Sequence, residues 1–303
     1  MKRLISFLLL LMIPNFCLAD MVGFSGDKRR YVTDEEKSQF PYNTVVRIEK
    51  NGGASHGTGT FVSKDVILTC RHVVDGNSSQ TIDYFTADGM QYSGDIIAGT
   101  SQEEYDDQHD FAWVVNRNAF SGSVLKLSPK SISSNNLTII GYDSLKPLSN
   151  DEIQIIKHVY SDWIKKNGKI KKDNAFDAMA AVDVAIKFDY ACSFGQKEGC
   201  VKCKNPNSRK SCLFNDGENM KVRKGCRVTS VGSLTNQITT NCPGASGASG
   251  SAIIDENTNQ IIGVLCNVVR PQIGQEQQAT SSGTTPEVYY KSLKYWIDGM
   301  KNW

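Results

Sequence analysis

Short runs of branched apolar residues, separated by turn residues, make up most of the chain from residue 44 onward. The predicted strands cover residues 44–48, 59–62, 66–69, 111–115, 137–140, 227–229, 252–254 and 261–265. Asn51-Gly52-Gly53 breaks the first run, and Ser63-Lys64-Asp65 joins the second and third as a hairpin. Short strands at this spacing predict an all-β protein, either a sandwich or a barrel.

A segment from about residue 146 to residue 224 has a different pattern. Apolar residues recur there at helical spacing after Ser149, and residues 174–188 predict a second, alanine-rich helix. Five cysteines lie between Cys192 and Cys226. We therefore expect a helical, cysteine-rich insertion, and we expect an amphipathic helix over about residues 286–300 at the end of the chain.

The first 19 residues have the layout of a secretory signal peptide. Lys2 and Arg3 precede an apolar run over residues 4–13, and Cys17-Leu18-Ala19 is a suitable cleavage sequence. The apolar run is too short to anchor the chain across a bilayer, and no later stretch is long and apolar enough to span one. The sequence predicts an exported protein, secreted or periplasmic, with a mature domain over residues 20–303. A short buried helix is the alternative interpretation.

Composition and charge narrow the class of protein. Of the 303 residues, 40% are hydrophobic and 22% are charged, which is the mix of a soluble globular protein with a core. The formal net charge of +2 favours neither nucleic acid nor a membrane surface as a partner. The lysines over residues 165–172 suit a solvated face, and they also suit a binding surface for an acidic partner.

Cysteine usage favours disulfide bonds. Cleavage after Ala19 leaves eight cysteines, an even number that favours pairing in an exported protein. The spacing Cys200-x-x-Cys203 would also suit a zinc site, which export into an oxidising compartment disfavours. Eight cysteines allow 105 pairings, so the sequence does not fix them. A bond between Cys242 and Cys266, which flank the serine discussed next, is one possibility.

Three residues together form a candidate nucleophilic site. A serine hydroxyl needs a base to take its proton, a group that orients the base, and donors for an oxyanion. His72 follows the strand over residues 66–69, Asp110 stands directly before the apolar run over residues 111–115, and Ser249 precedes residues 252–254. This chain order, His then Asp then Ser, is the order used on β-barrel scaffolds.

The serine lies in a run of small residues that suits an oxyanion site. Gly247 lets the backbone turn so that the N–H groups of Gly247 and Ser249 are directed at one oxygen. Gly244-Ala245-Ser246-Gly247 repeats the same pattern, so Ser246 is a rival nucleophile. Ser249 is preferred because the apolar strand begins three residues after it. Taken alone, the run also suits a flexible loop.

The sequence around these residues resembles the trypsin-like serine proteases, and most of all their bacterial glutamyl endopeptidase branch. The resemblance lies in Leu-Thr-x-x-His-Val-Val around His72, Asp-Phe-Ala at Asp110 and Gly-x-Ser-Gly-Ser at Ser249. It covers about residues 28–147 and 225–303. It implies two six-stranded antiparallel β-barrels with the active cleft between them, a C-terminal helix, and peptide-bond hydrolysis through an acyl-enzyme. We expect protein or peptide substrates, no cofactor or metal, no nucleic-acid partner, and a monomer.

The chain departs from that family in its substrate pocket. Pro243 stands where trypsin has an acid, and Gly244 and Leu265 stand where glutamyl endopeptidases have a hydroxyl residue and a histidine. Ala248 replaces the acid that binds the new N-terminus in trypsin. With Leu265 and Val268 in its wall, the pocket is predicted to accept small or medium apolar side chains. The alternative to an enzyme is a binding protein without catalytic activity on the same fold.

Overall fold

The structure is a computed structural model. It describes residues 29–50, 52–53, 55–75, 77, 79–98, 110–130, 132–143, 147, 217–232, 237–242, 247–269, 280–286 and 290. The leader, most of the predicted insertion and nearly all of the predicted C-terminal helix lie outside these residues. Within the described ranges, no helix combines the length and the apolar character needed to cross a membrane.

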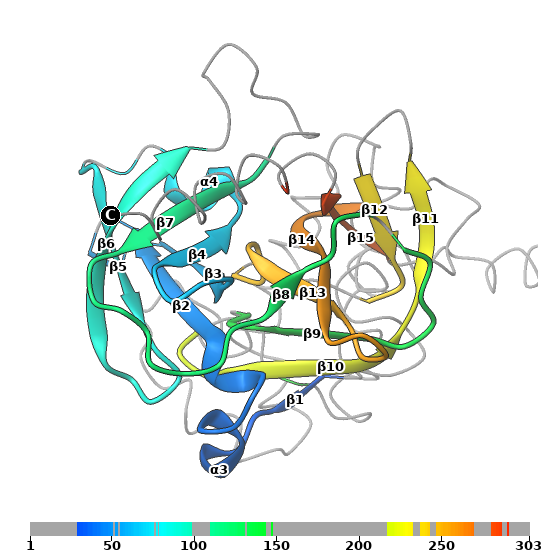
Figure 1. The fold of residues 1–303 in the computed structure, drawn as a ribbon, viewed down its shortest axis with the longest axis horizontal. Helices are drawn as coiled ribbons and strands as arrows, with labels where there is room; N and C mark the ends of the chain where they lie inside the picture. The colour runs from blue at the N-terminus through cyan, green and yellow to red at the C-terminus, as the bar shows by residue number, and fades with distance from the viewer. Residues whose placement is uncertain are drawn as a thin grey trace, which may run out of the picture.

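The first half of the described chain is a closed six-stranded barrel. Its strands are antiparallel and follow the order β2-β3-β4-β7-β6-β5, with β5 pairing back to β2. The bounds are β2 Val45–Lys50, β3 Ser55–Phe61, β4 Val66–Thr69, β5 Thr81–Phe85, β6 Gln91–Ala98 and β7 Ala112–Asn116. In Figure 1 this barrel is drawn in blue, cyan and green. It presents α4, Arg71–Val74, at the end of β4.

The second half forms a nine-stranded sheet that closes through one bent strand. The sheet follows the order β1-β10-β9-β13-β14-β15-β12-β11, with β8 beside β14. Only Arg227 separates β10 from β11, so the two are halves of one strand that pairs with β9 first and with β12 afterwards. When β10 and β11 are counted as one strand, they form a second six-stranded barrel with β9, β13, β14, β15 and β12. Strands β1 and β8 pair outside it. The bounds are β1 Arg29–Tyr31, β8 Lys126–Leu127, β9 Leu137–Gly141, β10 Lys221–Cys226, β11 Val228–Gly232, β12 Gln237–Thr240, β13 Ser251–Asp255, β14 Gln260–Val269 and β15 Thr280–Thr284.

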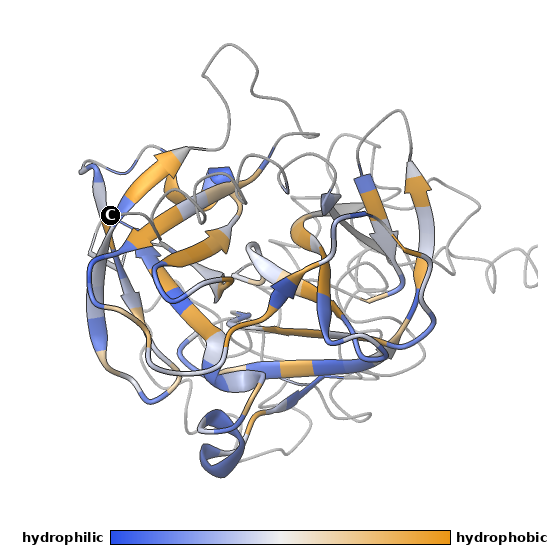
Figure 2. Cartoon of the chain, in the orientation of Figure 1, coloured by the Kyte–Doolittle hydropathy of each residue, from blue (hydrophilic) through white to orange (hydrophobic). Residues whose placement is uncertain are grey.

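Strands at the centre of the second barrel are buried on both faces. In β13, Ile253 joins the cluster inside that barrel, whereas Ala252 and Ile254 join the cluster that continues into the first barrel. The reason is that successive side chains of a strand point to opposite faces. These strands therefore read as continuous apolar runs, and Figure 2 shows such orange stretches within the strands while α3 is polar.

The N-terminal strand is held by a buried ion pair. Asp143, just after β9, pairs with Arg29 of β1 at 3.0 Å and with Arg223 of β10. Lys221 donates from Nζ to the Asp143 carbonyl oxygen at 2.6 Å. Burial alone would raise the pKa of Asp143, but the positive charges of Arg223 and Arg29 lower it below its usual value.

Two short helical elements follow β1. They are the α-helix α3, Asp34–Lys37, and the 3-10 helix η1, Tyr42–Thr44. The Thr33 hydroxyl accepts the N–H of Glu36, and the Glu36 carboxylate accepts the N–H of Thr33, so a reciprocal cap begins α3.

The two-barrel fold confirms the fold class expected from the sequence, although one strand begins earlier than predicted and β1, β5, β6, β8, β12 and β15 were not predicted. The strand predicted to begin at Arg227 begins at Lys221, inside the end of the predicted insertion. The glycine in Arg223-Lys224-Gly225 hid it, because Gly225 takes a positive φ of 69° at a bulge. Strand β5 was missed because it has no continuous apolar run, and β6 was missed because Ser93-Gly94-Asp95 interrupts its apolar residues.

Replacement of the buried carboxylate tests the role of this ion pair. We expect Asp143→Asn to lower the free energy of unfolding by about 3–5 kcal/mol, because the variant keeps the buried guanidinium groups and loses the charge they share. Asp95→Asn is the matched control, since Asp95 pairs with Arg117 on the exposed surface, where water screens the charges. Urea unfolding of both variants should show a large loss for the first and little change for the second. Equal losses would contradict this account.

Candidate active site

Strand pairing brings His72 and Asp110 together at one edge of the first barrel. Thr69, at the end of β4, pairs with Ala112 of β7, so the chain enters α4 beside the residue that precedes β7. One carboxylate oxygen of Asp110 lies 2.6 Å from Nδ1 of His72, and the other accepts the backbone N–H of His72 at 3.0 Å. Asp110 is buried, whereas the side chain of His72 is 38% exposed. The carboxylate therefore fixes the ring at its Nδ1 edge and leaves the Nε2 edge accessible.

The loop that carries Ser249 is shaped by two glycines with positive φ, Gly247 at 90° and Gly250 at 92°. A side chain at Gly250 would meet the carbonyl oxygen of Thr58 at 1.8 Å, so a larger residue does not fit. The N–H of Gly250 donates to the Leu265 carbonyl at 2.8 Å, and the N–H of Ser251 donates to that of Ala248 at 3.0 Å. The loop is thus tightly turned and fixed on β14.

Thr58 of β3 ties this loop to the first barrel. Its N–H donates to the carbonyl of Ser249 at 2.8 Å, and its hydroxyl donates to the carbonyl of Gly247 at 2.9 Å. The same hydroxyl accepts the N–H of Tyr142 at 3.0 Å. Thr58 was not predicted from the sequence. Its flanking glycines were a signal, because a side chain at Gly57 would collide with Val73.

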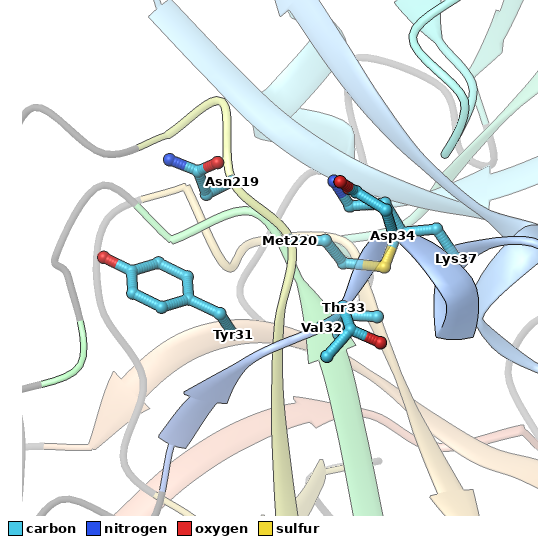
Figure 3. Close-up of a pocket in the computed structure, with 7 residues that line it drawn as sticks. All are labelled: Tyr31, Val32, Thr33, Asp34, Lys37, Asn219 and Met220. Atoms are coloured by element: carbon cyan, nitrogen blue, oxygen red, sulfur yellow. The ribbon is translucent and has the colours of Figure 1, made fainter.

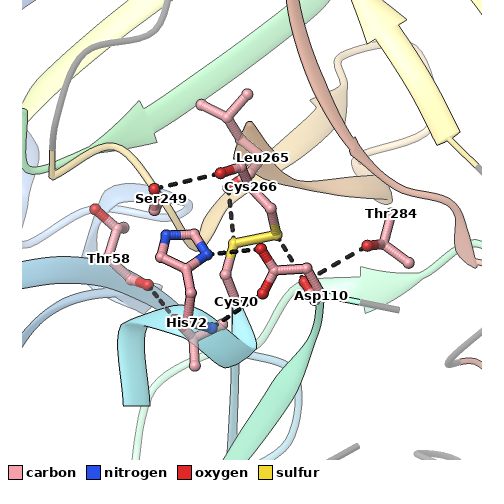
Figure 4. The surroundings of a disulfide bond; sticks show 9 residues. Thr58, Cys70, His72, Asp110, Ser249, Leu265, Cys266 and Thr284 are labelled. Carbon is pink, nitrogen blue, oxygen red and sulfur yellow. Dashed lines mark hydrogen bonds and ion pairs between the residues drawn. A yellow bond between two sulfur atoms is a disulfide. The ribbon is translucent and has the colours of Figure 1, made fainter. Parts of the chain in front are cut away.

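The Ser249 hydroxyl lies on the accessible side of the histidine. Figure 4 shows the second ring nitrogen of His72 turned toward Ser249, across the ring from Asp110. The hydroxyl itself donates to the carbonyl oxygen of Cys266, in a long contact of 3.5 Å. Catalytic hydrogen bonds are often long or poorly aligned before a substrate binds. The sequence-predicted His, Asp and Ser therefore converge on one region, with the Asp–His bond formed and the Ser hydroxyl turned to the backbone.

Two disulfide bonds link described cysteines. Neither joins Cys242 to Cys266, so the pairing that the sequence left as a possibility is wrong. Cys70 pairs with Cys266 and Cys226 pairs with Cys242, with Cα–Cα distances of 5.6 Å and 5.4 Å. Cys70 lies next to the histidine motif but far from Cys266 in sequence, and only the meeting of the two barrels brings them together. Cys200 and Cys203, whose spacing would also suit a zinc site, lie outside the described residues.

Cys70 and Cys266 offer no metal site while they form a disulfide. Sulfur atoms of Cys70 and Cys266 lie with a carboxylate oxygen of Asp110 within 4.8 Å of one another. Metal ligation requires thiolates, and a disulfide has none. The three residues therefore form a covalent bridge beside a carboxylate rather than a set of ligands.

His56 lies beneath the serine loop. Its Nε2 is 3.0 Å from the carbonyl oxygen of Tyr142, and the ring is so close to Gly247 that an added methyl group there would lie 2.3 Å from Nε2. Burial lowers the pKa of His56, with a smaller opposing effect of the bond to Tyr142. The neutral ring thus supports the loop from inside the molecule. His56 lies in β3, and no role for it was predicted from the sequence.

The predicted substrate pocket is described only in part. Leu265 is buried, in the same apolar cluster as Ala248 and Cys242. Pro243, Gly244 and the side chain of Val268 lie outside the described part of the structure. A separate hollow of about 450 Å³, shown in Figure 3, is lined by residues of β1, of α3, of the link between them and of the segment just before β10, and none of the candidate catalytic residues lines it.

Comparison with known proteins assigns the class. The family model of the trypsin-like peptidase domain matches residues 57–264, which is more than half of the chain. The protein therefore belongs to the trypsin-like peptidase family. No curated protein sequence matches it.

Several solved structures of proteases are similar to this chain. A Glu endopeptidase in complex with MPD is similar at a TM-score of 0.52 and 18% identity, over 91% of this chain and 98% of that one. A serine-to-alanine mutant of Rv3671c from M. tuberculosis H37Rv, in an inactive form, gives 0.46 and 14%, over 84% and 86%. The VesB protease of Vibrio cholerae gives 0.48 and 11%, over 90% and 67%. At such identity, the likeness to the Glu endopeptidase supports the two-barrel fold and no particular substrate.

The depressed pKa of His56 makes a testable contribution to stability. As the pH falls below the usual histidine pKa of about 6.5, the unfolded chain binds a proton at residue 56 more readily than the folded chain does. This contribution to stability is therefore present above that pH and is lost below it. Urea unfolding at pH 8 and pH 5 should show a smaller loss on acidification for His56→Gln, whose amide can still donate to Tyr142. Equal losses in the variant and the wild type would contradict the prediction.

Proposed function

We propose that this peptidase is a serine endopeptidase in which His72, Asp110 and Ser249 are the catalytic triad. The observation that carries the proposal is the pair of hydrogen bonds that the Asp110 carboxylate accepts from His72, with the free edge of the ring turned toward Ser249. A carboxylate bound to Nδ1 fixes the tautomer that leaves Nε2 free to accept a proton. His72 takes the hydroxyl proton of Ser249 as its oxygen attacks the scissile carbonyl, and Asp110 stabilises the resulting cation.

The N–H groups of Gly247 and Ser249 are the proposed oxyanion donors. Among the described residues, no acceptor is recorded for either N–H, whereas those of Gly250 and Ser251 are bonded to the backbone. The carbonyls of Gly247 and Ser249 are held by Thr58, which fixes the direction of the adjoining peptide groups. Fixed donors of this kind stabilise the negative charge of a tetrahedral intermediate. His72 then returns the proton to the leaving amine, and water releases the acyl-enzyme.

Export is part of the proposal. The leader over residues 1–19 predicts a secreted or periplasmic protein. Two disulfides within the described residues support this location, since such bonds persist in oxidising compartments.

The nucleophile is tested by replacement of its hydroxyl. Ser249→Ala should lower kcat by roughly 10⁴-fold or more, because the acyl-enzyme cannot form. It should also abolish labelling by a fluorophosphonate probe. Ser246→Ala is the matched control, since it removes the rival hydroxyl, and it should keep both activities. Full activity of Ser249→Ala would sink the triad. Absence of labelling in folded wild-type protein would favour a binding protein without catalytic activity, in which the hydroxyl stays on the Cys266 carbonyl.

The substrate preference is tested by a peptide library. We propose cleavage after small or medium apolar residues, because Leu265 contributes an apolar side chain and Pro243 and Gly244 carry no charge. Mass spectrometry of the products should show alanine, valine or leucine before the cleaved bond. Dominant cleavage after glutamate, lysine or arginine would reject this pocket.

A further inference from the structure

We propose that the Cys70–Cys266 disulfide is a positioning element of the active site, which holds the His72 helix against the strand beside Ser249. This inference rests on the triad proposed above. The bond joins the first barrel to the second, between residues 196 apart in sequence. It is the only one of the two disulfides among described residues that crosses between the barrels.

Cys70 stands where the helix that carries His72 begins. It is the residue directly before α4, in an extended conformation, and it separates the end of β4 from the helix that carries the histidine. The side chain of Cys70 makes no capping hydrogen bond, and the first turn is bonded by a side chain from outside the helix, the Asp110 carboxylate that accepts the N–H of His72. A four-residue helix has little stability of its own, so its position depends on what holds its ends. The buried sulfur of Cys70 anchors that first end.

Cys266 sits at an irregularity of β14. The pairing with β15 shifts there, since Leu265 faces Gly283 and Asn267 faces Ser282, so Cys266 is the extra residue of a bulge. Its carbonyl oxygen is the acceptor of the Ser249 hydroxyl. Bulges redirect a strand and occur beside active sites. The disulfide therefore fixes the piece of β14 that contacts the serine.

The same bond borders the acid of the triad. Sγ of Cys266 lies 2.8 Å from the backbone carbonyl oxygen of Asp110, and the Thr284 hydroxyl donates to that oxygen at 3.5 Å. Figure 4 shows the disulfide at the centre, with His72 and Ser249 to its left and Asp110 to its right. All three proposed catalytic residues thus adjoin one covalent link.

Hydrogen bonds of Thr58 also link the two barrels here, and they reach the serine loop and Tyr142. They hold the carbonyls of Gly247 and Ser249 and leave α4 and Cys266 to other contacts. Catalysis demands much closer placement than folding does, because a misplacement of about 1 Å can cost 10²-fold in rate. Loss of the disulfide should therefore slow acylation in a protein that is still folded.

The test compares two double variants. Cys70→Ala/Cys266→Ala removes the bond between barrels, and Cys226→Ala/Cys242→Ala removes the bond within the second barrel. The first should lower kcat and the rate of inactivation by a small fluorophosphonate about 10- to 100-fold, with KM of a peptide substrate within a few-fold of wild type. The second should lower the melting temperature and leave the inactivation rate close to wild type. Rates are measured well below the melting temperatures of both variants.

The outcomes separate this inference from the triad. An unchanged rate in the folded Cys70/Cys266 variant overturns the positioning role and leaves the triad intact. Equal slowing in both variants also overturns it, because general loosening would then explain the effect. No labelling of folded wild-type protein overturns the triad itself.

Two further measurements cover a variant that does not fold. Cys70→Ala/Cys266→Val fills part of the space of the sulfurs and should show the same slowing. If it also fails to fold, wild-type protein is reduced with a phosphine, labelled briefly with a biotinylated fluorophosphonate, and alkylated in denaturant. Captured chains should carry less alkylation at Cys70 than uncaptured chains. Equal alkylation in the two fractions would contradict the positioning role.

Discussion

The buried carboxylate of Asp110 is the interaction on which the proposed chemistry depends. It binds both the ring and the backbone N–H of His72, so it sets where the helix starts as well as how the imidazole is oriented. A buried carboxylate requires such partners, since an unpaired charge in the protein interior is costly. The pairing of β4 with β7 supplies them, because it places the residue before β7 beside the residues after β4. The register of β4 and β7 in the barrel therefore also determines the placement of His72 relative to Asp110.

The second requirement is a close approach of the two barrels. The serine loop lies against β3, where Gly57 and Gly250 leave no room for a side chain. A side chain at Gly57 would meet both Val73 of α4 and the carbonyl oxygen of Ser249. The histidine helix and the serine loop therefore border the same glycine. Small residues here serve the approach of backbone to backbone. The apolar cluster that runs through both barrels keeps the two halves in contact.

The sequence predicted the fold and the convergence of the candidate residues, and it failed where partners are distant. His72, Asp110 and Ser249 were found because each adjoins a continuous apolar strand, which is a local signal. Cys70 and Thr58 have local signals that are weak, since their partners lie in the other barrel. The bend at Arg227 was also hidden, because pairing with both β9 and β12 is not a property of the residues in that strand.

Both hydrogen bonds and a covalent bond align the two barrels at the site. Thr58 bonds to backbone carbonyls of the serine loop, and such bonds tolerate small shifts because their geometry is broad. The Cys70–Cys266 bridge fixes a Cα–Cα distance of 5.6 Å between the base of the histidine helix and the strand behind the serine. A chain exported to an oxidising compartment can form such a bridge, and a cytosolic one rarely keeps it. The proposed export and the proposed alignment of the triad are therefore connected, because the first supplies the condition for the second.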